Sequence, residues 1–477
     1  MKKLDIIFLS VILIIAFVLR MYNIGTPLAD LHSWRQADTA AVARNFSRHG
    51  INLLKPQYDD ISSIQSGLEN PEGLRMVEFP IYNAIIAVFH RYLPITTITV
   101  YGRAISSFFS LLIISVIYYL ALLEKNRLAA IAASTIYAVF PFFVFFSRLV
   151  LPETTAVAFM MLSLFFLYTA TKKKQIQVAP MILSAVFLAL SLLTKPTTIF
   201  YGLAVGFLFI DNLRFQLMKN WKPYVFALLT LAPFIWWRWY ILYFPEAIPS
   251  NSWLLTHVNT FEGSKEIFFR PAFFRWIFME RIGVAILGIY GVFFLIMGLI
   301  IKTKRLFIPS IAASAFIYLM TFQGGNVQHE YYQTIILPAI ALICGIGIAG
   351  IVEFPSKFIK KTVLYPTILI IFILSIAFSY YRVKDYYYYP KDLPQVAELI
   401  KTFTQPEDKI VTDRSGDTTL LYLADRKGAP GVYKDLNELK ELGYTYFVTS
   451  NSGMKDRLKR ENYVVLVENE IYMIVKL

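Results

Sequence analysis

Residues 100–123 read VYGRAISSFFSLLIISVIYYLALL, and Arg103 near the beginning is the only charged residue in this run. An α-helix needs about 20 apolar residues to cross the ~30 Å of hydrocarbon in a bilayer, so the run predicts a membrane-spanning helix. Apolar blocks of roughly 17–25 residues, the length that such a helix requires, recur along the chain. The predicted spans are 4–22, 100–123, 128–147, 152–171, 178–194, 197–213, 222–244, 283–301, 306–322, 334–353 and 362–381.

The composition excludes a soluble globular protein. Of the 477 residues, 57% are hydrophobic and only 16% are charged, whereas about a quarter of a soluble chain is charged. The formal net charge of +14 would suit a nucleic-acid partner, but Lys and Arg lie mainly in short clusters between apolar blocks, where they fix membrane orientation. We therefore predict a multi-pass protein embedded in the bilayer, with no nucleic-acid partner. The one cysteine, Cys344, lies in an apolar run and offers no disulfide framework.

One apolar segment decides the topology. Residues 79–94, FPIYNAIIAVFHRYLP, are short and carry His90 and Arg91, so they either cross the membrane or lie at its surface. If they do not cross, and Lys2 and Lys3 are cytoplasmic, every later basic cluster is cytoplasmic too, as the positive-inside rule requires. We predict an interfacial or re-entrant helix here, and eleven spans of a plasma-membrane protein with its N-terminus inside and its C-terminus outside. The deciding clusters are Lys125/Arg127, Lys172–Lys174, Arg214–Lys222, Lys302–Arg305 and Lys357–Lys361.

The chain divides into a transmembrane part, 1–381, and a soluble extracytoplasmic tail, 382–477. Two outer loops interrupt the first part: 23–99, with juxtamembrane helices, and 245–282, rich in aromatic residues and proline. The predicted fold class is an all-α polytopic membrane protein of about 11 spans with a small C-terminal α/β domain. In the tail we expect helices at 393–403, 436–442 and 454–460, and strands at 409–413, 444–450, 463–467 and 471–477.

The densest group of polar residues follows the first span. An amphipathic helix is expected from about 36 to 49, with Ala40, Val42, Ala43 and Phe46 lying on the membrane. A carboxylate at a partly dry interface has a raised pKa and suits a general base. Solvation of an interfacial helix explains any single charge here equally well, but the density of the group favours a function. Its candidate residues are Asp30, His32, Trp34, Arg35, Gln36 and Asp38.

Further candidates lie beside the predicted spans. Glu78 immediately precedes the 79–94 segment, where a negative charge also simply favours a helix N-terminus. Each of the others, taken alone, is typical of a charge that reaches from a helix end to the interface. Together the three basic residues among them supply cations at the depth of a lipid phosphate. The four residues are Arg103, Arg148, Glu153 and Lys195.

A last candidate group lies near the tenth span. Residues 323–332 read QGGNVQHEYY, in which Gly324 and Gly325 permit a tight turn. His329, Tyr331 and Tyr332 are of the kind that contacts a sugar or, for His329, a metal ion, although one His beside one Glu is weak support for a metal site.

In these features the chain resembles the polyprenyl-phosphate-dependent glycosyltransferases of the GT-C fold. That superfamily includes the protein O-mannosyltransferases and the lipid A aminoarabinose transferases. The resemblance rests on one span ending in Arg20, a long outer loop with acids, and the phrase HEYYQ…LP at 329–338. The phrase HSWRQADTAAVARNF at 32–46 is similar to a prokaryotic branch labelled glycosyltransferase family 39.

The resemblance implies a sugar donor carried on undecaprenyl or dolichyl phosphate and an acceptor outside the cytoplasm. It also implies that an acid of the first loop assists the acceptor and that a cation stabilises the departing lipid phosphate. Relatives typically carry an Asp-Glu pair in that loop, whereas this chain has Asp30 and Asp38 on either side of WRQ. Asp30 is favoured as the base because it directly follows the first span. The position of Glu78 resembles that of a metal-binding acid in some relatives, which leaves a divalent ion at Glu78 or His329 open.

Two other functional classes compete with this one. A lipid-linked glycan ligase or polymerase would use a diphosphate-linked oligosaccharide. A transporter or flippase usually carries ionisable residues at the bilayer midplane, and the predicted spans have few. A mere anchor for the outer tail would not need eleven spans. No dinucleotide-binding fingerprint or P-loop occurs, which suits an enzyme whose donor is already activated by its lipid phosphate.

Overall fold

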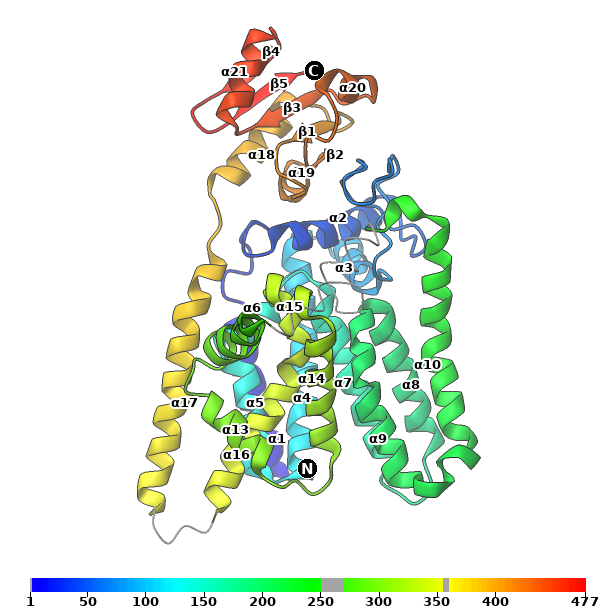
Figure 1. The fold of residues 1–477 in the computed structure, drawn as a ribbon, viewed down its shortest axis with the longest axis vertical. Helices are drawn as coiled ribbons and strands as arrows, with labels where there is room; N and C mark the ends of the chain where they lie inside the picture. The colour runs from blue at the N-terminus through cyan, green and yellow to red at the C-terminus, as the bar shows by residue number, and fades with distance from the viewer. Residues whose placement is uncertain (1, 250–269, 355–359) are drawn as a thin grey trace. The chain divides into compact units, whose positions relative to one another are not determined.

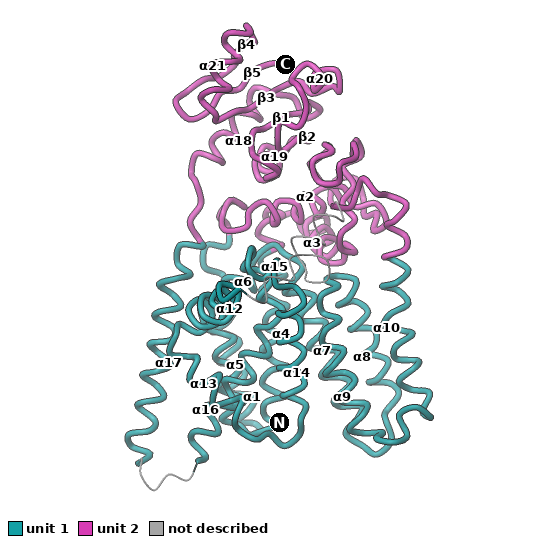
Figure 2. Tube along the Cα trace, in the orientation of Figure 1, with its two compact units in different colours: residues 1–24, 103–237, 252–386 teal, residues 25–102, 238–251, 387–477 magenta. Residues whose placement is uncertain are grey.

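The computed structural model describes residues 2–249, 270–354 and 360–477. The chain forms two compact units, coloured separately in Figure 2. Unit 1 comprises Met1–Ile24, Arg103–Trp237 and Ser252–Tyr386. Unit 2 comprises Gly25–Gly102, Arg238–Asn251 and Tyr387–Leu477, so it combines the first outer loop with the C-terminal tail.

The described part of unit 1 is helical, and α7 packs against α8 while α16 packs against α5 and α13 (Figure 1). Six stretches of the described residues are long and apolar enough to cross a membrane, which confirms a multi-pass membrane protein. They correspond to α4, α7, α9 with its flanking turns, α10, α16 and α17. The helices are α1 Lys3–Arg20, α4 Ile98–Glu124, α5 Arg127–Val139, α6 Pro141–Phe146, α7 Pro152–Ala170, α8 Val178–Thr194, α9 Gly202–Leu213, α10 Trp221–Tyr240, α12 Pro271–Phe274, η7 Arg275–Ile286, α13 Val292–Ile300, α14 Phe307–Thr321, α15 Gln323–Gln328, η8 Glu330–Ile336, α16 Leu337–Glu353 and α17 Lys361–Val383.

Two predicted spans are interrupted. The span expected at 128–147 is divided into α5 and α6, because Phe140 is extended and Pro141 starts a new helix. The span expected at 283–301 is divided between η7, a π-helix, and α13. Gly288 in the break has a φ of +57°, and a Cβ there would lie 1.9 Å from the Ser375 carbonyl oxygen of α17. Close packing against α17 therefore requires glycine and a bent chain at this point.

The basic clusters of unit 1 converge on one of its ends. Salt bridges join Arg127 to Asp5 at 2.6 Å and Lys125 to Glu353 at 2.6 Å. Figure 1 shows the N-terminus and the turns that join α7 to α8 and α9 to α10 at this same end of unit 1. The other contacts there are Lys304 Nζ to the Leu123 carbonyl, Arg305 to Asp211, the Asn212 amide to the Lys173 carbonyl, and Lys222 Nζ to the Ile176 carbonyl. Lys357 lies outside the described residues, as does the central part of the 245–282 loop.

The tail in unit 2 forms a five-stranded sheet in the order β2-β1-β3-β5-β4 (Figure 1). β1 is parallel to β2 and β3, and β5 is antiparallel to β3 and β4. Alternate residues of β1 enter different cores: Ile410 packs with α18 and α19, and Val411 packs with α20 and α21. The predicted α/β fold is thus observed. Its elements are α18 Asp392–Phe403, β1 Ile410–Thr412, α19 Thr419–Ala424, β2 Gly428–Ala429, α20 Leu436–Glu441, β3 Tyr446–Thr449, α21 Ser452–Arg460, β4 Val464–Glu468 and β5 Met473–Lys476.

The first outer loop, also in unit 2, contains α2 (Ser33–His49) and α3 (Ile81–Tyr92) and pairs with the sheet. The Gly428 amide donates to the Asp59 carbonyl, and the Ile61 amide donates to the Gly428 carbonyl, both at 2.9 Å. Val42 and Phe46 of α2 pack against Tyr58 and α3. The prediction that these two side chains lie on the membrane is therefore wrong, because protein covers them.

Candidate functional site

The acids of the first outer loop are held by specific partners, beginning with Asp30. Gln36, in the first turn of α2, donates from Nε2 to Asp30 Oδ1 at 2.7 Å and to the Leu31 carbonyl at 3.1 Å. Asp30 is only 4% exposed, and Gln36 is fully buried. A hydrogen bond from a buried amide fixes the orientation of the carboxylate, which is the condition for accepting a proton from a positioned group.

Glu78 interacts with two cations, Arg35 and Arg238. Arg35 Nη2 is 2.5 Å from Glu78 Oε1, and the two side chains are 6% and 12% exposed. Arg238, near the end of α10, interacts electrostatically with the same carboxylate. The candidates Arg35 and Glu78 thus form one buried, charge-assisted pair.

Asp38 uses both carboxylate oxygens. Oδ2 is 2.8 Å from Arg75 Nη2, and Oδ1 accepts from the Thr418 hydroxyl at 2.6 Å. Burial raises the pKa of Asp38, while the nearby Arg75 and Arg35 guanidinium groups oppose that rise. Asp38 therefore joins the first outer loop to the tail domain through an ion pair with Arg75 and a hydrogen bond from Thr418.

His32 and Trp34 flank the start of α2. His32 adopts a left-handed backbone with a φ of +58° and immediately precedes the helix. The Trp34 carbonyl accepts from the Thr418 hydroxyl at 3.3 Å. Both residues are neighbours of Asp30, Arg35 and Gln36 along the chain.

A second acidic group was missed in the sequence. Asp59 is buried and is 2.6 Å from Arg44, and burial raises its pKa against the effect of that guanidinium. Asp60 accepts from the Ser62 amide at 2.9 Å and the Ser62 hydroxyl at 2.6 Å, both at Oδ1. Burial raises the pKa of Asp60 to about 7. Two consecutive acids in the first outer loop were the signal that would have identified them.

Five predicted residues meet in unit 1. Lys195 Nζ is 2.6 Å from Glu153 Oε1, and these side chains are 10% and 2% exposed. The same ammonium group lies 6.0 Å from the ring centroid of Tyr331 and 5.6 Å from that of Tyr332. His329 stacks against both rings, at 5.5 and 6.2 Å. The aromatic rings and the carboxylate together hold one partly buried cation in place.

Arg103 and Arg148 have a different environment. Both are fully buried and donate to the Asn23 carbonyl, at 3.4 and 2.9 Å, and Arg103 also donates to the Ile24 carbonyl at 2.9 Å. Carbonyls beyond the end of a helix lack partners within it, so these two arginines stabilise the chain where α1 ends. This structural role was not predicted for them.

The residues described here do not fit a divalent ion. Glu78 is already paired with Arg35, and the His329 ring is stacked against the rings of Tyr331 and Tyr332. Glu330, beside His329, is ion-paired with Arg281. Among residues 2–249, 270–354 and 360–477, no group of three or more His, Cys, Asp or Glu side chains is arranged to hold a metal ion.

Comparison with known proteins is independent of the geometry described above. Residues 80–239 match the family model described as dolichyl-phosphate-mannose-protein mannosyltransferase. A search of curated protein sequences gave no match.

Solved structures match nearly the whole chain. The crystal structure of ArnT from Cupriavidus metallidurans bound to undecaprenyl phosphate matches with a TM-score of 0.68 at 13% identity, covering 99% of this chain and 97% of that chain. The oligosaccharyltransferase AglB from Archaeoglobus fulgidus, in complex with an inhibitory peptide and a dolichol-phosphate, matches with a TM-score of 0.60 at 11% identity, covering 94% and 69%. The arabinofuranosyltransferase AftD from Mycobacteria matches with a TM-score of 0.52 at 14% identity, covering 94% and 35%.

Proposed function

We propose that this chain, whose fold is that of the GT-C membrane glycosyltransferases, transfers a sugar from a polyprenyl-phosphate carrier to an acceptor outside the cytoplasm. The observation that carries the proposal is a match over 99% of the chain, at 13% identity, to a crystal structure of ArnT bound to undecaprenyl phosphate. The sugar is a hexose or a pentose, and the acceptor is a protein, a lipid or a glycan of the cell envelope.

The chemistry assigns one role to each group of residues. The acceptor oxygen attacks the anomeric carbon, Asp30 takes the acceptor proton, and the bond from that carbon to the phosphate oxygen breaks, with inversion. Gln36 holds Asp30 in place, as its 2.7 Å hydrogen bond supports. The polyprenyl phosphate leaves with the electron pair, and Lys195 offsets the charge that develops on it.

The other candidates position the reactants. Arg35, which closely follows Asp30 in the sequence, forms a buried pair with Glu78, and this pair orients the acceptor together with His32 and Trp34. Glu153, Tyr331, Tyr332 and His329 hold Lys195 and contact the donor. Asp38, Arg103 and Arg148 keep the backbone around these groups in place, which their buried hydrogen bonds support.

The proposed topology is the one predicted from charge: about eleven spans in the plasma membrane, including the interrupted ones. The basic end of unit 1 is then cytoplasmic, and residues 382–477 form an extracytoplasmic domain. The gathering of the basic clusters at one end supports this orientation.

The test is release of polyprenyl phosphate from a short-chain polyprenyl-phosphate sugar by the purified chain. We predict that Asp30→Asn accumulates normally in membranes but loses transfer by about 10²–10⁴-fold, the usual contribution of a general base. Asp456→Asn, an exposed acid in the same unit, is the matched control and should retain full activity. Unchanged turnover in Asp30→Asn would remove this residue from the mechanism, and failure of the wild type to release the lipid phosphate would refute the function.

A second candidate is a lipid-linked glycan ligase or polymerase. The match to AglB, an oligosaccharyltransferase, favours it specifically. A polyprenyl-diphosphate oligosaccharide offered beside the monophosphate donor separates the two, because only the ligase would consume the diphosphate. Movement of the donor across vesicles without bond cleavage would instead support a transporter.

A further inference from the structure

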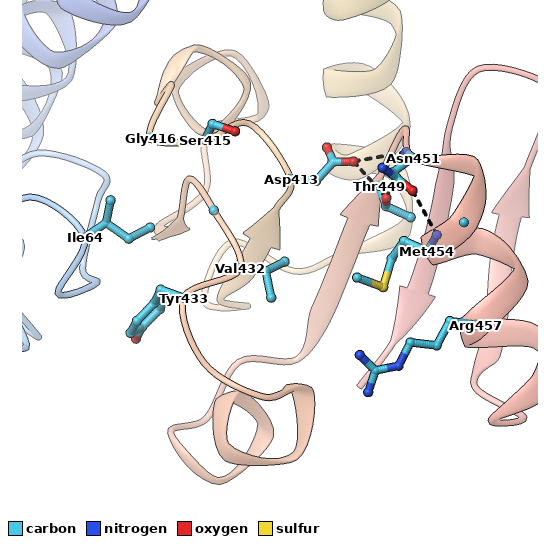
Figure 3. Close-up of a pocket in the computed structure, with 12 residues that line it drawn as sticks. Ile64, Asp413, Ser415, Gly416, Val432, Tyr433, Thr449, Asn451, Met454 and Arg457 are labelled. Carbon is cyan, nitrogen blue, oxygen red and sulfur yellow. Dashed lines mark hydrogen bonds between the residues drawn. The ribbon is translucent and has the colours of Figure 1, made fainter.

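An open pocket of about 620 Å³ lies in unit 2, at one edge of the tail sheet (Figure 3). Its lining comes from the segments that follow three strands and from the first outer loop. Asp413 and Ser415 follow β1, Val432 follows β2, and Asn451 follows β3. Ile64 is the contribution of the first outer loop. None of these residues has a role in the transfer mechanism proposed above.

The pocket occupies the place where this sheet topology favours a ligand. β1 and β3 are adjacent and parallel, but the chain leaves β1 toward β2 on one side and leaves β3 toward β4 and β5 on the other. Such a change of direction leaves a crevice at the carboxyl ends of the two strands, and ligands bind there in open α/β sheets.

One wall of the pocket is polar, and its charge arrangement argues against a phosphate ligand. Asp413 Oδ2 accepts from the Ser450 amide at 2.7 Å, the Thr449 hydroxyl at 2.8 Å and the Asn451 amide at 3.2 Å. The carboxylate thus fills the position at the start of α21 where a bound phosphate would otherwise accept the same amides. A second anion would be repelled by Asp413.

The same wall retains groups that can bond a neutral ligand. Asp413 Oδ1 has a single long contact, 3.5 Å, to the Ser450 hydroxyl. The side-chain oxygen of Asn451 caps α21. The side-chain nitrogen, Nδ2, is left as a donor. Arg457 is paired through Nε with Glu461 at 2.7 Å and through Nη2 with Asp435 at 3.6 Å, and among the described residues no such pair involves its Nη1. One carboxylate, one amide and one guanidinium can therefore bond the hydroxyl groups of a neutral ligand.

The opposite wall is apolar. Figure 3 shows Ile64, Val432 and Tyr433 on one side of the pocket, and Asp413, Asn451, Met454 and Arg457 on the other. Gly431 maintains this wall, because a Cβ there would lie 3.3 Å from Ile64 Cδ1. A pocket with one apolar wall and one hydroxyl-binding wall matches a sugar ring, which presents C–H groups on its faces and hydroxyl groups at its edge.

We propose that this pocket binds a neutral sugar unit of a glycan acceptor, and so holds the acceptor on the outer domain during transfer. The inference rests on the proposed function and narrows its acceptor to a molecule that already carries carbohydrate.

The experiment measures binding of neutral trisaccharides (mannotriose, maltotriose and chitotriose) to the full chain in detergent by saturation-transfer NMR. Val432→Trp should fill the pocket, and Arg457→Gln should remove a donor, each weakening binding of the preferred trisaccharide by about tenfold or more. Val464→Trp and Arg460→Gln are the matched controls, since Val464 is exposed on β4 and Arg460 lies on α21 outside the pocket lining. If Val432→Trp fails to fold, Arg457→Gln still decides the test.

Binding of one trisaccharide that both pocket variants weaken and both controls retain supports the proposal. No binding to the wild type, equal binding in all variants, or displacement of the sugar by inorganic phosphate would each overturn it. Release of polyprenyl phosphate is measured on the same preparations, with a short-chain polyprenyl-phosphate sugar as donor and each of the three trisaccharides as acceptor. Its absence counts against the proposed function alone, so the two failures are distinguishable.

Discussion

Asp38 and Arg75 form a buried ion pair, with side chains 2% and 10% exposed, and Arg75 also lies 5.0 Å from the centroid of the Tyr58 ring. Removing one member of such a pair leaves the other charge buried without compensation, at a cost of about 3–5 kcal/mol. We predict that Asp38→Asn and Arg75→Met each lower the thermal unfolding midpoint strongly, and that the double variant recovers much of the loss.

A double-mutant cycle on thermal unfolding in detergent measures this coupling. Lys401 and Glu398, an exposed pair on α18, provide the control cycle, because exposed pairs contribute only about 0–1 kcal/mol. Additive losses at Asp38 and Arg75 would contradict the prediction.

Asp60 carries a pH dependence of stability. It has zero exposure, and burial raises its pKa from 3.8 to about 7. Because the folded protein holds this proton while the unfolded chain releases it near pH 4, stability falls as the pH rises from about 4 to 7 and then levels off. The raised pKa of Asp60 corresponds to a decrease of roughly 4 kcal/mol in the free energy of unfolding between about pH 4 and pH 7. We predict that Asp60→Asn flattens this part of the profile of unfolding midpoint against pH, whereas Asp456→Asn keeps the slope.

The sequence indicated candidate site residues, but it did not indicate which residues they would bond. Asp30, Arg35 and Glu78 were identified, and the structure gives each a specific bond. The partner of Asp38 in the tail, Thr418, is 380 residues away along the chain, so no local pattern connects them. Asp59 and Asp60 were not predicted, because this segment is held by hydrogen bonds to Gly428 of the distant tail.

At the level of helices, glycines set how closely α13 and α16 approach. A Cβ at Gly298 of α13 would lie 1.9 Å from the Ile343 carbonyl oxygen of α16, whereas a Cβ at Gly206 of α9 meets nothing within 4 Å. Small residues at a crossing permit such close packing in membranes. We predict that Gly298→Ala destabilises the protein by about 1–3 kcal/mol, as overpacking does.

Gly206→Ala is the matched control, and it should be neutral or stabilising by up to about 1 kcal/mol because alanine is the better helix former. Denaturation in detergent, followed by loss of helical circular dichroism, compares the two variants. Equal effects of the two alanines would show that the crossing of α13 and α16 does not depend on glycine.

Elements with their own pattern were predictable, and those formed only by packing were not. Long apolar runs predicted α4, α7 and α10, and short strand-like runs predicted β3 and β5. Strand β2 has only two residues, too few for any periodic signal, and exists because its neighbours pair with it. The break between η7 and α13 depends on contact with α17, so a hydropathy pattern could not reveal it.

For the whole molecule, two observations bear on topology. Helix α3 has 12 residues, about 18 Å at 1.5 Å per residue, which is too short to cross a bilayer. The loop around Asp59 is hydrogen-bonded to Gly428 of the tail sheet, so the first outer loop and the tail must lie on one side of the membrane. Both agree with the alternative in which 79–94 does not cross.

Cysteine labelling tests this arrangement in intact cells. The single natural cysteine, Cys344, is buried and should not react. We predict that Leu68→Cys in the first loop and Asp456→Cys in the tail react with an impermeant maleimide, whereas Lys173→Cys, in the basic turn between α7 and α8, reacts only after permeabilisation. All three positions are exposed, so reactivity reports the side of the membrane. Labelling of Leu68→Cys and Asp456→Cys under opposite conditions would place unit 2 on both sides of the bilayer, and an acceptor held by the tail could then not reach Asp30.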